Sequence, residues 1–247
     1  MVRQIRLPLV ALVAALSLTQ VAQAHESETM TTKTDDSGIA YPQIERGDVV
    51  EEQFGVKVAD PYRWLENDVR EDEKVANWVA EENKVTHAYL DTLDGRDALE
   101  KRMTEFFDYQ RFGIPRKSGG KYFYTRNDGL QNQSVLYVRD SLNGEGRLLI
   151  DPNGWSKDGA TALDSWVPSE DGTKLIYSIQ DGGSDWRTVK VLDVATGKPM
   201  ADEIKWVKFS ALDWDKAGNG FFYSRFPEPA EGAAFQSLNT GQAVYYH

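Results

Sequence analysis

Few side chains in this sequence could serve as a nucleophile or a general base. The 247 residues contain no Cys and only three His, which are His25, His87 and His247. The absence of Cys excludes thiolate nucleophiles, disulfides and thiolate metal sites. His87 has polar neighbours within a helical pattern, and a lone helical His is usually a surface residue. Chemistry that depends on a histidine base therefore has few candidates here.

A serine nucleophile also lacks its usual setting. In hydrolases of the α/β type the serine occupies a sharp strand-to-helix turn, flanked by glycines in the pattern G-x-S-x-G. The nearest run is Gly154-Trp155-Ser156-Lys157-Asp158, where Asp158 replaces the second glycine. Turn residues surround Ser156, without a strand before it or a helical pattern after it. The sequence predicts no catalytic residue in this chain.

Metal and cofactor motifs are equally weak. Asp213 and Asp215 are spaced like the start of a calcium loop, but Ala217 takes the fifth position and Ser224 takes the twelfth, where a bidentate Glu is required. An Asp-rich turn before a strand is the simpler interpretation. Neither a Walker loop nor G-x-G-x-x-G occurs. The sequence predicts no metal site and no cofactor.

The composition indicates a folded, acidic protein. Hydrophobic residues make up 40% and aromatic residues 11%, which is enough to form a core. There are 28 basic and 39 acidic residues, and the net charge is −11. Without a basic cluster to neutralise phosphates, nucleic acid is not an expected partner.

Residues 1–24 have the pattern of a secretory signal peptide. Arg3 and Arg6 precede an apolar run from Leu7 to Leu18, and Ala22-Gln23-Ala24 is a small-x-small cleavage pattern. A transmembrane anchor is the alternative, but the run is shorter than the ~20 residues that span a bilayer. We expect cleavage before His25, a secreted or periplasmic protein without a membrane anchor, and a flexible spacer over residues 25–40.

Residues 41–112 have a helical pattern after an extended start. Apolar residues recur at three- and four-residue steps between Glu71 and Leu93, which predicts an amphipathic helix with one buried stripe. Gly95 is a plausible stop. A second helix is predicted over Asp97–Asp108, with Leu99, Met103, Phe106 and Phe107 on one side.

After Phe112 the pattern changes to short strands separated by turns. The predicted strands are Lys121–Arg126, Ser134–Asp140, Arg147–Ile150, Lys174–Ile179, Thr188–Asp193, Gly220–Ser224 and Ala243–Tyr246. Similar runs recur at Tyr124, Tyr177 and Tyr223, separated by 53 and 46 residues. A period near 50 with several strands per unit favours a long-blade β-propeller, and a β-sandwich is the alternative.

The third unit contains only two of the predicted strands before His247. A propeller needs about four blades to close. The expected fold is therefore mainly β: a partial long-blade propeller over residues 113–247, with two blades and part of a third, preceded by the helical segment 41–112.

Several runs together resemble the prolyl oligopeptidase family of serine peptidases. They are Asp60–Glu66, Gly129–Val138, Leu149–Asn153, Gly183–Trp186, Lys208–Ser210 and Val244–His247. The resemblance implies that residues 41–112 belong to the side of a C-terminal α/β-hydrolase domain, which carries the catalytic triad. That domain, absent from this chain, would be the partner of both segments.

The resemblance also assigns roles to a few residues. Phe209 matches a propeller aromatic that lines an outer substrate subsite, although blade packing is an equally simple role. Asp185 matches an interdomain position that pairs with an Arg of the hydrolase domain. Ser224–Gln242 matches a mobile loop near the domain interface, but departs from the family pattern in sequence.

Two hypotheses follow. In the first, the chain is the N-terminal part of an exported serine endopeptidase that cleaves short peptides after proline, with the propeller gating access and no cofactor required. In that case short proline-containing peptides are the substrates of the intact enzyme, and this chain alone is expected to be inactive. In the second, the chain is a non-enzymatic secreted binding module built on a β-propeller.

Overall fold

The computed structural model describes residues 33–34 and 38–247, which fall into two compact units, Met1–Ile44 and Glu45–His247. The predicted signal peptide lies outside the described residues. In the first unit, strand β1 (Lys33–Thr34) pairs antiparallel with β2 (Ala40–Tyr41), inside the segment predicted as a spacer. Every statement below concerns the second unit.

The second unit begins with a hairpin and three helical elements. Strand β3 (Val50–Gln53) pairs with β4 (Val56–Ala59), and the turn η1 (Arg63–Glu66) follows. Arg63 joins them through ion pairs of 2.6 Å to Glu51 and to Asp60. Part of the Asp60–Glu66 motif therefore ties the hairpin to the turn.

Both predicted helices are confirmed. Helix α1 covers Glu73–Leu90 and α2 covers Arg96–Phe107. Asp72 caps α1 by accepting hydrogen bonds from the amides of Lys74 and Val75. Gly95 precedes α2 with a φ of 81°, in the left-handed region that glycine adopts without strain.

The stripe predicted on α1 is only partly covered: Val75 is buried, Trp78, Val79 and Val85 are half-buried, and Tyr89 is exposed. Among the residues of α1 and α2 only Val75 is buried, while Leu99, Met103, Phe106 and Phe107 are all at least half exposed. Periodicity correctly indicates an apolar face but does not indicate what covers it. No helix in the described part of the chain is long and apolar enough to cross a bilayer.

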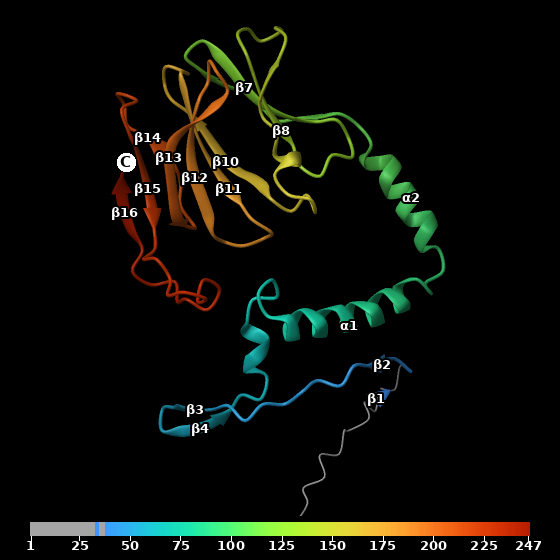
Figure 1. The fold of residues 1–247 in the computed structure, drawn as a ribbon. Helices are drawn as coiled ribbons and strands as arrows, with labels where there is room; N and C mark the ends of the chain where they lie inside the picture. Colours follow the sequence, from blue (N-terminus) through green and yellow to red (C-terminus); the bar gives the residue numbers. More distant parts are fainter. Residues whose placement is uncertain (1–32, 35–37) are drawn as a thin grey trace, which may run out of the picture. The chain divides into compact units, whose positions relative to one another are not determined.

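After α2 the chain forms antiparallel sheets in sequence order (Figure 1). The first sheet contains β5 (Arg111–Phe112), β6 (Arg116–Ser118), β7 (Lys121–Asn127), β8 (Val135–Arg139) and β9 (Arg147–Ile150). The turn η2 (Pro152–Gly154) leads to the second sheet, which contains β10 (Ala162–Pro168), β11 (Lys174–Gln180), β12 (Arg187–Asp193) and β13 (Lys198–Val207). The third contains β14 (Asp213–Trp214), β15 (Phe221–Arg225) and β16 (Ala243–Tyr246).

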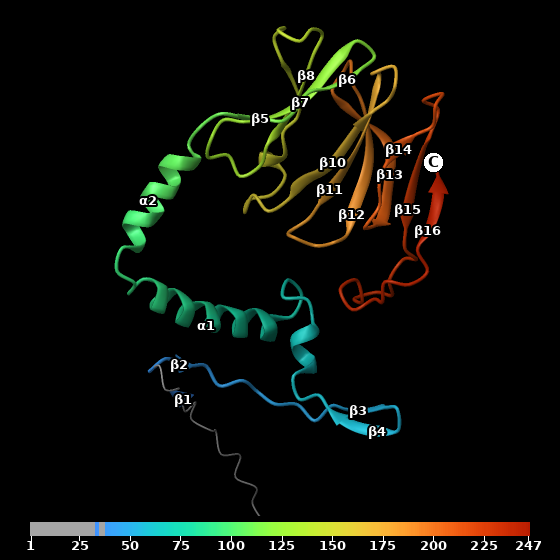
Figure 2. The ribbon, with the colours of Figure 1, turned by 180° about the vertical axis from the view of Figure 1, so that it is seen from behind.

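These sheets are the predicted blades, packed face to face (Figure 2). Phe123 and Leu136 of the first blade share a core with Leu175 and Tyr177 of the second. Ile176 of the second blade shares another core with Phe221 and other residues of the third. Because side chains alternate along a strand, the middle strands of the second blade pack one face against the first blade and the other against the third. This alternation accounts for the repeat in the sequence.

The outer face of the third blade is uncovered. Phe222 occupies the position of Phe123 and Ile176 in the earlier repeats, both of which are 0% exposed, yet Phe222 is 47% exposed. Val244 and Tyr246 on β16 are exposed as well. In this chain, therefore, the third blade has a large apolar face in contact with solvent.

Blade turns are closed by aspartates whose carboxylates accept hydrogen bonds. The hydroxyl of Ser169 donates a hydrogen bond to Asp171, and the hydroxyl of Thr196 donates one to Asp193. These hydrogen bonds lower the pKa of both carboxyls below the usual 3.8. In Asp158 the backbone amide of Ala160 has the same effect on the pKa. The turns therefore favour the ionised form of each carboxyl.

We expect the thermal stability of this chain to decrease as the pH falls below about 4. A carboxyl with a depressed folded-state pKa contributes stability above its unfolded pKa and loses that contribution on protonation. Melting curves at pH 6, 4 and 3 would measure this. Asp171→Asn keeps an acceptor and should make the decline shallower, whereas identical melting temperatures at pH 6 and 3 would contradict the expectation.

Candidate functional site

A cavity of about 290 Å³ lies beside the second blade, at the segment that leads to the third. Its wall includes Asp164 from β10, Ser178 from β11, Arg187 from β12, Val207 at the end of β13 and Phe209–Leu212 after it. The Phe209 side chain is one of the exposed large apolar groups. Blade packing is therefore not the role of the Phe209 ring in this chain.

The backbone at Phe209 is held in an unusual conformation. Its φ is +53°, and Trp206 has a φ of +63°. Non-glycine residues in this region are strained and need support from their surroundings. The support comes from residues 224–242: Phe226 N donates to Trp206 O (3.0 Å), Ser224 N donates to Ser210 Oγ (2.7 Å), and Gln242 Nε2 donates to Lys208 O (3.2 Å).

The buried side chain of Lys208 also anchors this segment. The residue is only 6% exposed, and its ammonium lies 3.8 Å from the ring centroid of Trp186 and 5.2 Å from that of Phe226. Aromatic faces attract a cation, and more strongly where water is excluded. The Lys208 side chain is therefore buried among aromatic rings, and the exposed Phe209 ring also lies 5.9 Å from its ammonium.

Arg187 connects the cavity to the turn that contains Asp185. Its Nε forms a 2.9 Å ion pair with Oδ2 of Asp164, and its Nη1 donates to the carbonyls of Ser184 and Asp185. Asp164 reaches this position because it lies where the pairing of β10 with β11 slips by one residue, a bulge that re-aims a side chain. Asp185 itself is exposed, and its carboxylate forms no ion pair among the described residues.

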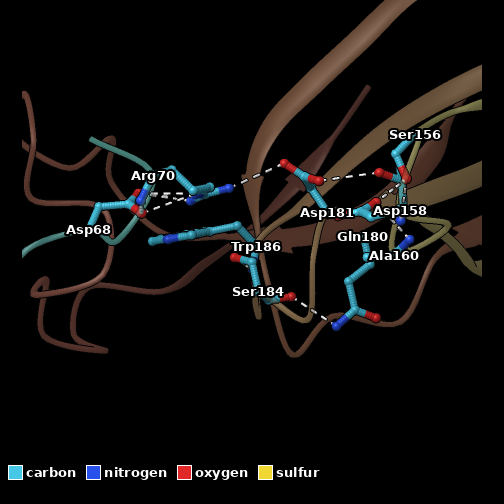
Figure 3. A network of polar contacts seen from close by, with 10 residues as sticks. Asp68, Arg70, Ser156, Asp158, Ala160, Gln180, Asp181, Ser184 and Trp186 are labelled. Atoms are coloured by element: carbon cyan, nitrogen blue, oxygen red, sulfur yellow. Dashed lines mark hydrogen bonds and ion pairs between the residues drawn. The ribbon is translucent and has the colours of Figure 1, made fainter. Parts of the chain in front are cut away.

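A second polar network lies beside this turn (Figure 3). Arg70 donates to Asp68 and lies 3.4 Å from a carboxylate oxygen of Asp181. Those hydrogen bonds lower the pKa of the Asp68 carboxyl. Arg70 also stacks on Phe235, 5.0 Å from the ring centroid. The segment before α1 is thereby linked to the second blade and to the loop after β15.

The middle of that loop is held by three contacts, in addition to those that its two ends make with residues 206–210. Besides Phe235 under Arg70, Gln236 Nε2 donates to the carbonyl of Glu66 (3.2 Å), and Trp186 Nε1 donates to the carbonyl of Ala234 (2.7 Å). The sequence-based expectation for Ser224–Gln242 is a mobile loop. In the structure the two ends of the loop are fixed to residues 206–210, whereas Ala233–Ser237 in its middle dock through few contacts, and residues that dock in this way open locally at low cost.

We expect Arg70→Ala to loosen this loop. The substitution removes an exposed cation–π contact and two ion pairs, so amide hydrogen exchange at Ala233–Ser237 should accelerate about two- to fivefold. Arg102→Ala is the matched control, because Arg102 also stacks on a Phe and pairs with a Glu, but on α2. Equal exchange rates in wild type and Arg70→Ala would contradict the assigned role.

The remaining chemical candidates have structural partners. Ser156 Oγ donates to Asp158 and accepts from the amide of Thr161, which closes a turn. Asp215 accepts from Tyr246 Oη at 2.6 Å. His87 is exposed on α1, His247 lies 2.7 Å from Asp202, and His25 lies outside the described residues. Over residues 33–34 and 38–247, no three His, Asp or Glu side chains are grouped to hold a metal ion.

Sequence reasoning missed the Asp164–Arg187 pair and the Arg70 network. Asp164 and Arg187 lie on different strands, and no local spacing pattern indicates that a bulge brings them together. Sequence reasoning identified only Phe209 and Asp185 nearby. The structure brings both near Arg187, which donates to the Asp185 carbonyl and lines the cavity together with Phe209.

Antiparallel blades in sequence order, packed face to face, define a segment of a β-propeller. The family model for the prolyl oligopeptidase N-terminal beta-propeller domain matches residues 42–247. The chain belongs to the prolyl oligopeptidase family.

Individual relatives agree with the family assignment. The chain is 39% identical over 209 residues to the prolyl endopeptidase of Elizabethkingia meningoseptica, covering 85% of this chain and 29% of the relative. A solved prolyl endopeptidase, studied for inter-domain dynamics in catalysis and specificity, is 53% identical with a TM-score of 0.51, covering 84% of this chain and 29% of that one.

A second solved structure is prolyl oligopeptidase B of Galerina marginata, bound to a 25mer macrocyclization substrate. It is 27% identical with a TM-score of 0.63, covering 84% of this chain and 32% of that one. The chain thus spans about 30% of the length of these relatives.

Proposed function

We propose that this chain is the N-terminal portion of an exported serine endopeptidase that cleaves short peptides on the carboxyl side of proline. The observation that carries the proposal is the match of residues 42–247 to the propeller domain of prolyl oligopeptidases. The names of the relatives, prolyl endopeptidases, support the reaction. The catalytic serine, aspartate and histidine would come from a C-terminal hydrolase domain, which would pack on the exposed apolar face of α2.

In this proposal the blades contribute access and binding. A propeller over an active site admits thin, unfolded peptides and excludes folded proteins. Phe209 would contact the peptide, because its ring is exposed beside a cavity. Asp185 would pair with an arginine of the hydrolase domain, because its carboxylate is free to do so in this chain.

The test uses the protein encoded by the full reading frame that contains this chain. We expect it to release nitroaniline from a blocked Gly-Pro-nitroanilide and not from the matched Gly-Ala compound, and to be inactivated by a serine-directed organophosphate. Failure to cleave the proline substrate would refute the proposal. Residues 25–247 alone should not turn over either compound, and activity that survives their purification would contradict the absence of a nucleophile.

Gating and export have tests of their own. The full protein should cleave a proline-containing decapeptide and leave a folded protein with an exposed prolyl loop intact. Cleavage of that folded protein at a similar rate would contradict gating. Export predicts a mature N-terminus at His25, which Edman degradation of the protein from the producing cell would detect, whereas a retained Met1 would contradict it.

A non-enzymatic binding module is the second candidate. The uncovered face of the third blade disfavours it, since a freestanding module would have to leave Phe222, Val244 and Tyr246 in water. Reading the gene beyond codon 247 distinguishes the two. Further blades and a Gly-x-Ser-x-Gly sequence would support the peptidase, and a stop codon would support the module.

A further inference from the structure

We propose that the cavity beside Phe209 binds a neutral amide of the substrate peptide, an Asn or Gln side chain, between Arg187 and Asp164. This inference rests on the proposed peptidase function and adds a residue preference to it. It assigns a specificity-determining role to two side chains on different strands of the second blade.

The hydrogen-bonding capacity of the pair is only partly used. Nε of Arg187 faces Oδ2 of Asp164, and Nη1 is occupied by the carbonyls of Ser184 and Asp185. Oδ2 also accepts from Ser178 Oγ at 2.9 Å. Among the described residues, Nη2 of Arg187 and Oδ1 of Asp164 form no hydrogen bond. Because both side chains line the cavity, these two atoms are the donor and the acceptor that the pair can still offer to a ligand.

A primary amide matches this wall, and charged groups do not. Its carbonyl oxygen can accept from Nη2 while its NH2 donates to Oδ1. A carboxylate would face Asp164 and an ammonium would face Arg187, each at a short distance from a like charge. The two side chains are only 18% and 30% exposed, so water screens these interactions less than at an open surface.

The remaining walls fit the aliphatic part of such a side chain. The Phe209 ring, Val207 and Leu212 line the same cavity. Its volume of about 290 Å³ is small compared with pockets that hold drug-sized ligands. One side chain of a peptide fits this space better than a longer segment. Because contacts from residues 224–242 hold the Phe209 backbone, this wall is in place before a peptide arrives.

The main alternative is that the Asp164–Arg187 pair only holds the turn before β12. A structural pair would alter stability without changing which charge the enzyme prefers. Opposite changes in charge preference on removing one partner or the other would separate the two roles, since each single substitution leaves the opposite charge in the cavity.

The experiment measures kcat/KM of the full protein on acetyl-Xaa-Gly-Pro-nitroanilides, with Xaa as Gln, Met, Glu or Lys. Wild type should prefer Gln over Glu and Lys by about tenfold, mainly through KM. Asp164→Asn should raise the Glu/Lys ratio about tenfold, and Arg187→Met should lower it by a similar factor. Lys190→Met and Glu203→Gln are controls, because they break an ion pair in the same blade outside the cavity.

The outcomes are distinguishable. If wild type cleaves no proline substrate, the proposed function fails. If wild type cleaves all four peptides equally well, the amide site is wrong whatever the variants do, even if they fail to fold. If wild type prefers Gln but both variants keep the same Glu/Lys ratio, the preference arises elsewhere and the role of the pair is refuted.

Discussion

Gly119→Ala is expected to destabilise the contact between the first two blades severely. Gly119 has a φ of +55°, and a Cβ built there would lie 1.7 Å from the carbonyl oxygen of Asp171. The obstacle is backbone, which cannot rotate away as a side chain can. Gly119 N also donates to Glu170 O, and Ser118 Oγ donates to Ser169 O, so movement of the strand would break these bonds. We expect a loss of ~3–5 kcal/mol in the free energy of unfolding.

The adjacent glycine is the control. Gly120 also has a positive φ of +76°, but a Cβ there would meet nothing within 4 Å. Gly120→Ala should cost only the ~1–2 kcal/mol of left-handed backbone strain. Urea unfolding of both variants measures the difference. Similar losses in the two variants would show that the close approach to Asp171 is not what limits this position.

Phe221→Ala and Phe222→Ala are expected to differ by several kcal/mol although the residues are adjacent. Phe221 is 1% exposed in the core between the second and third blades, where deleting a phenyl ring costs ~3–5 kcal/mol. Phe222 points to the uncovered face, and its truncation in this chain should cost about 1 kcal/mol or less. Thermal and urea unfolding would measure both.

The same pair tests what covers the third blade. In the full protein a following blade would bury Phe222 as Phe123 and Ile176 are buried here, and Phe222→Ala should then cost ~3 kcal/mol. Phe221→Ala should cost the same in both forms. If Phe222→Ala is equally mild in the full protein, the third blade does not receive a neighbour on that face.

The strands with alternating apolar side chains could be predicted from the sequence, and others could not. Strands β9 and β16 match the predicted bounds, since their β-branched, aromatic and aliphatic residues stand out between turns. Strand β13 was missed because its exposed positions carry Lys and Glu. Its pairing with β12 defines it as a strand, and pairing is a tertiary property.

The candidate site shows the same limit. Phe209 was found through resemblance, and its strained backbone could not be foreseen, because the hydrogen bonds that hold it come from residues 224–242. Asp164 and Arg187 meet through a bulge in β10, which no residue pattern marks. Predicting which side chains from separate strands lie together requires the register of the sheet, and the register cannot be read from the sequence.

The order of strands has a consequence for how the chain is made. Each blade consists of strands that are close together in sequence, so most hydrogen-bonded ladders close over short loops, and the β15–β16 ladder closes over residues 226–242. As synthesis proceeds from the N-terminus, β10–β13 can pair fully before β14 has left the ribosome. The nascent chain can therefore lengthen the propeller one blade at a time, with each finished blade offering the next its packing surface, so that the apolar surface exposed to aggregation at any moment stays small.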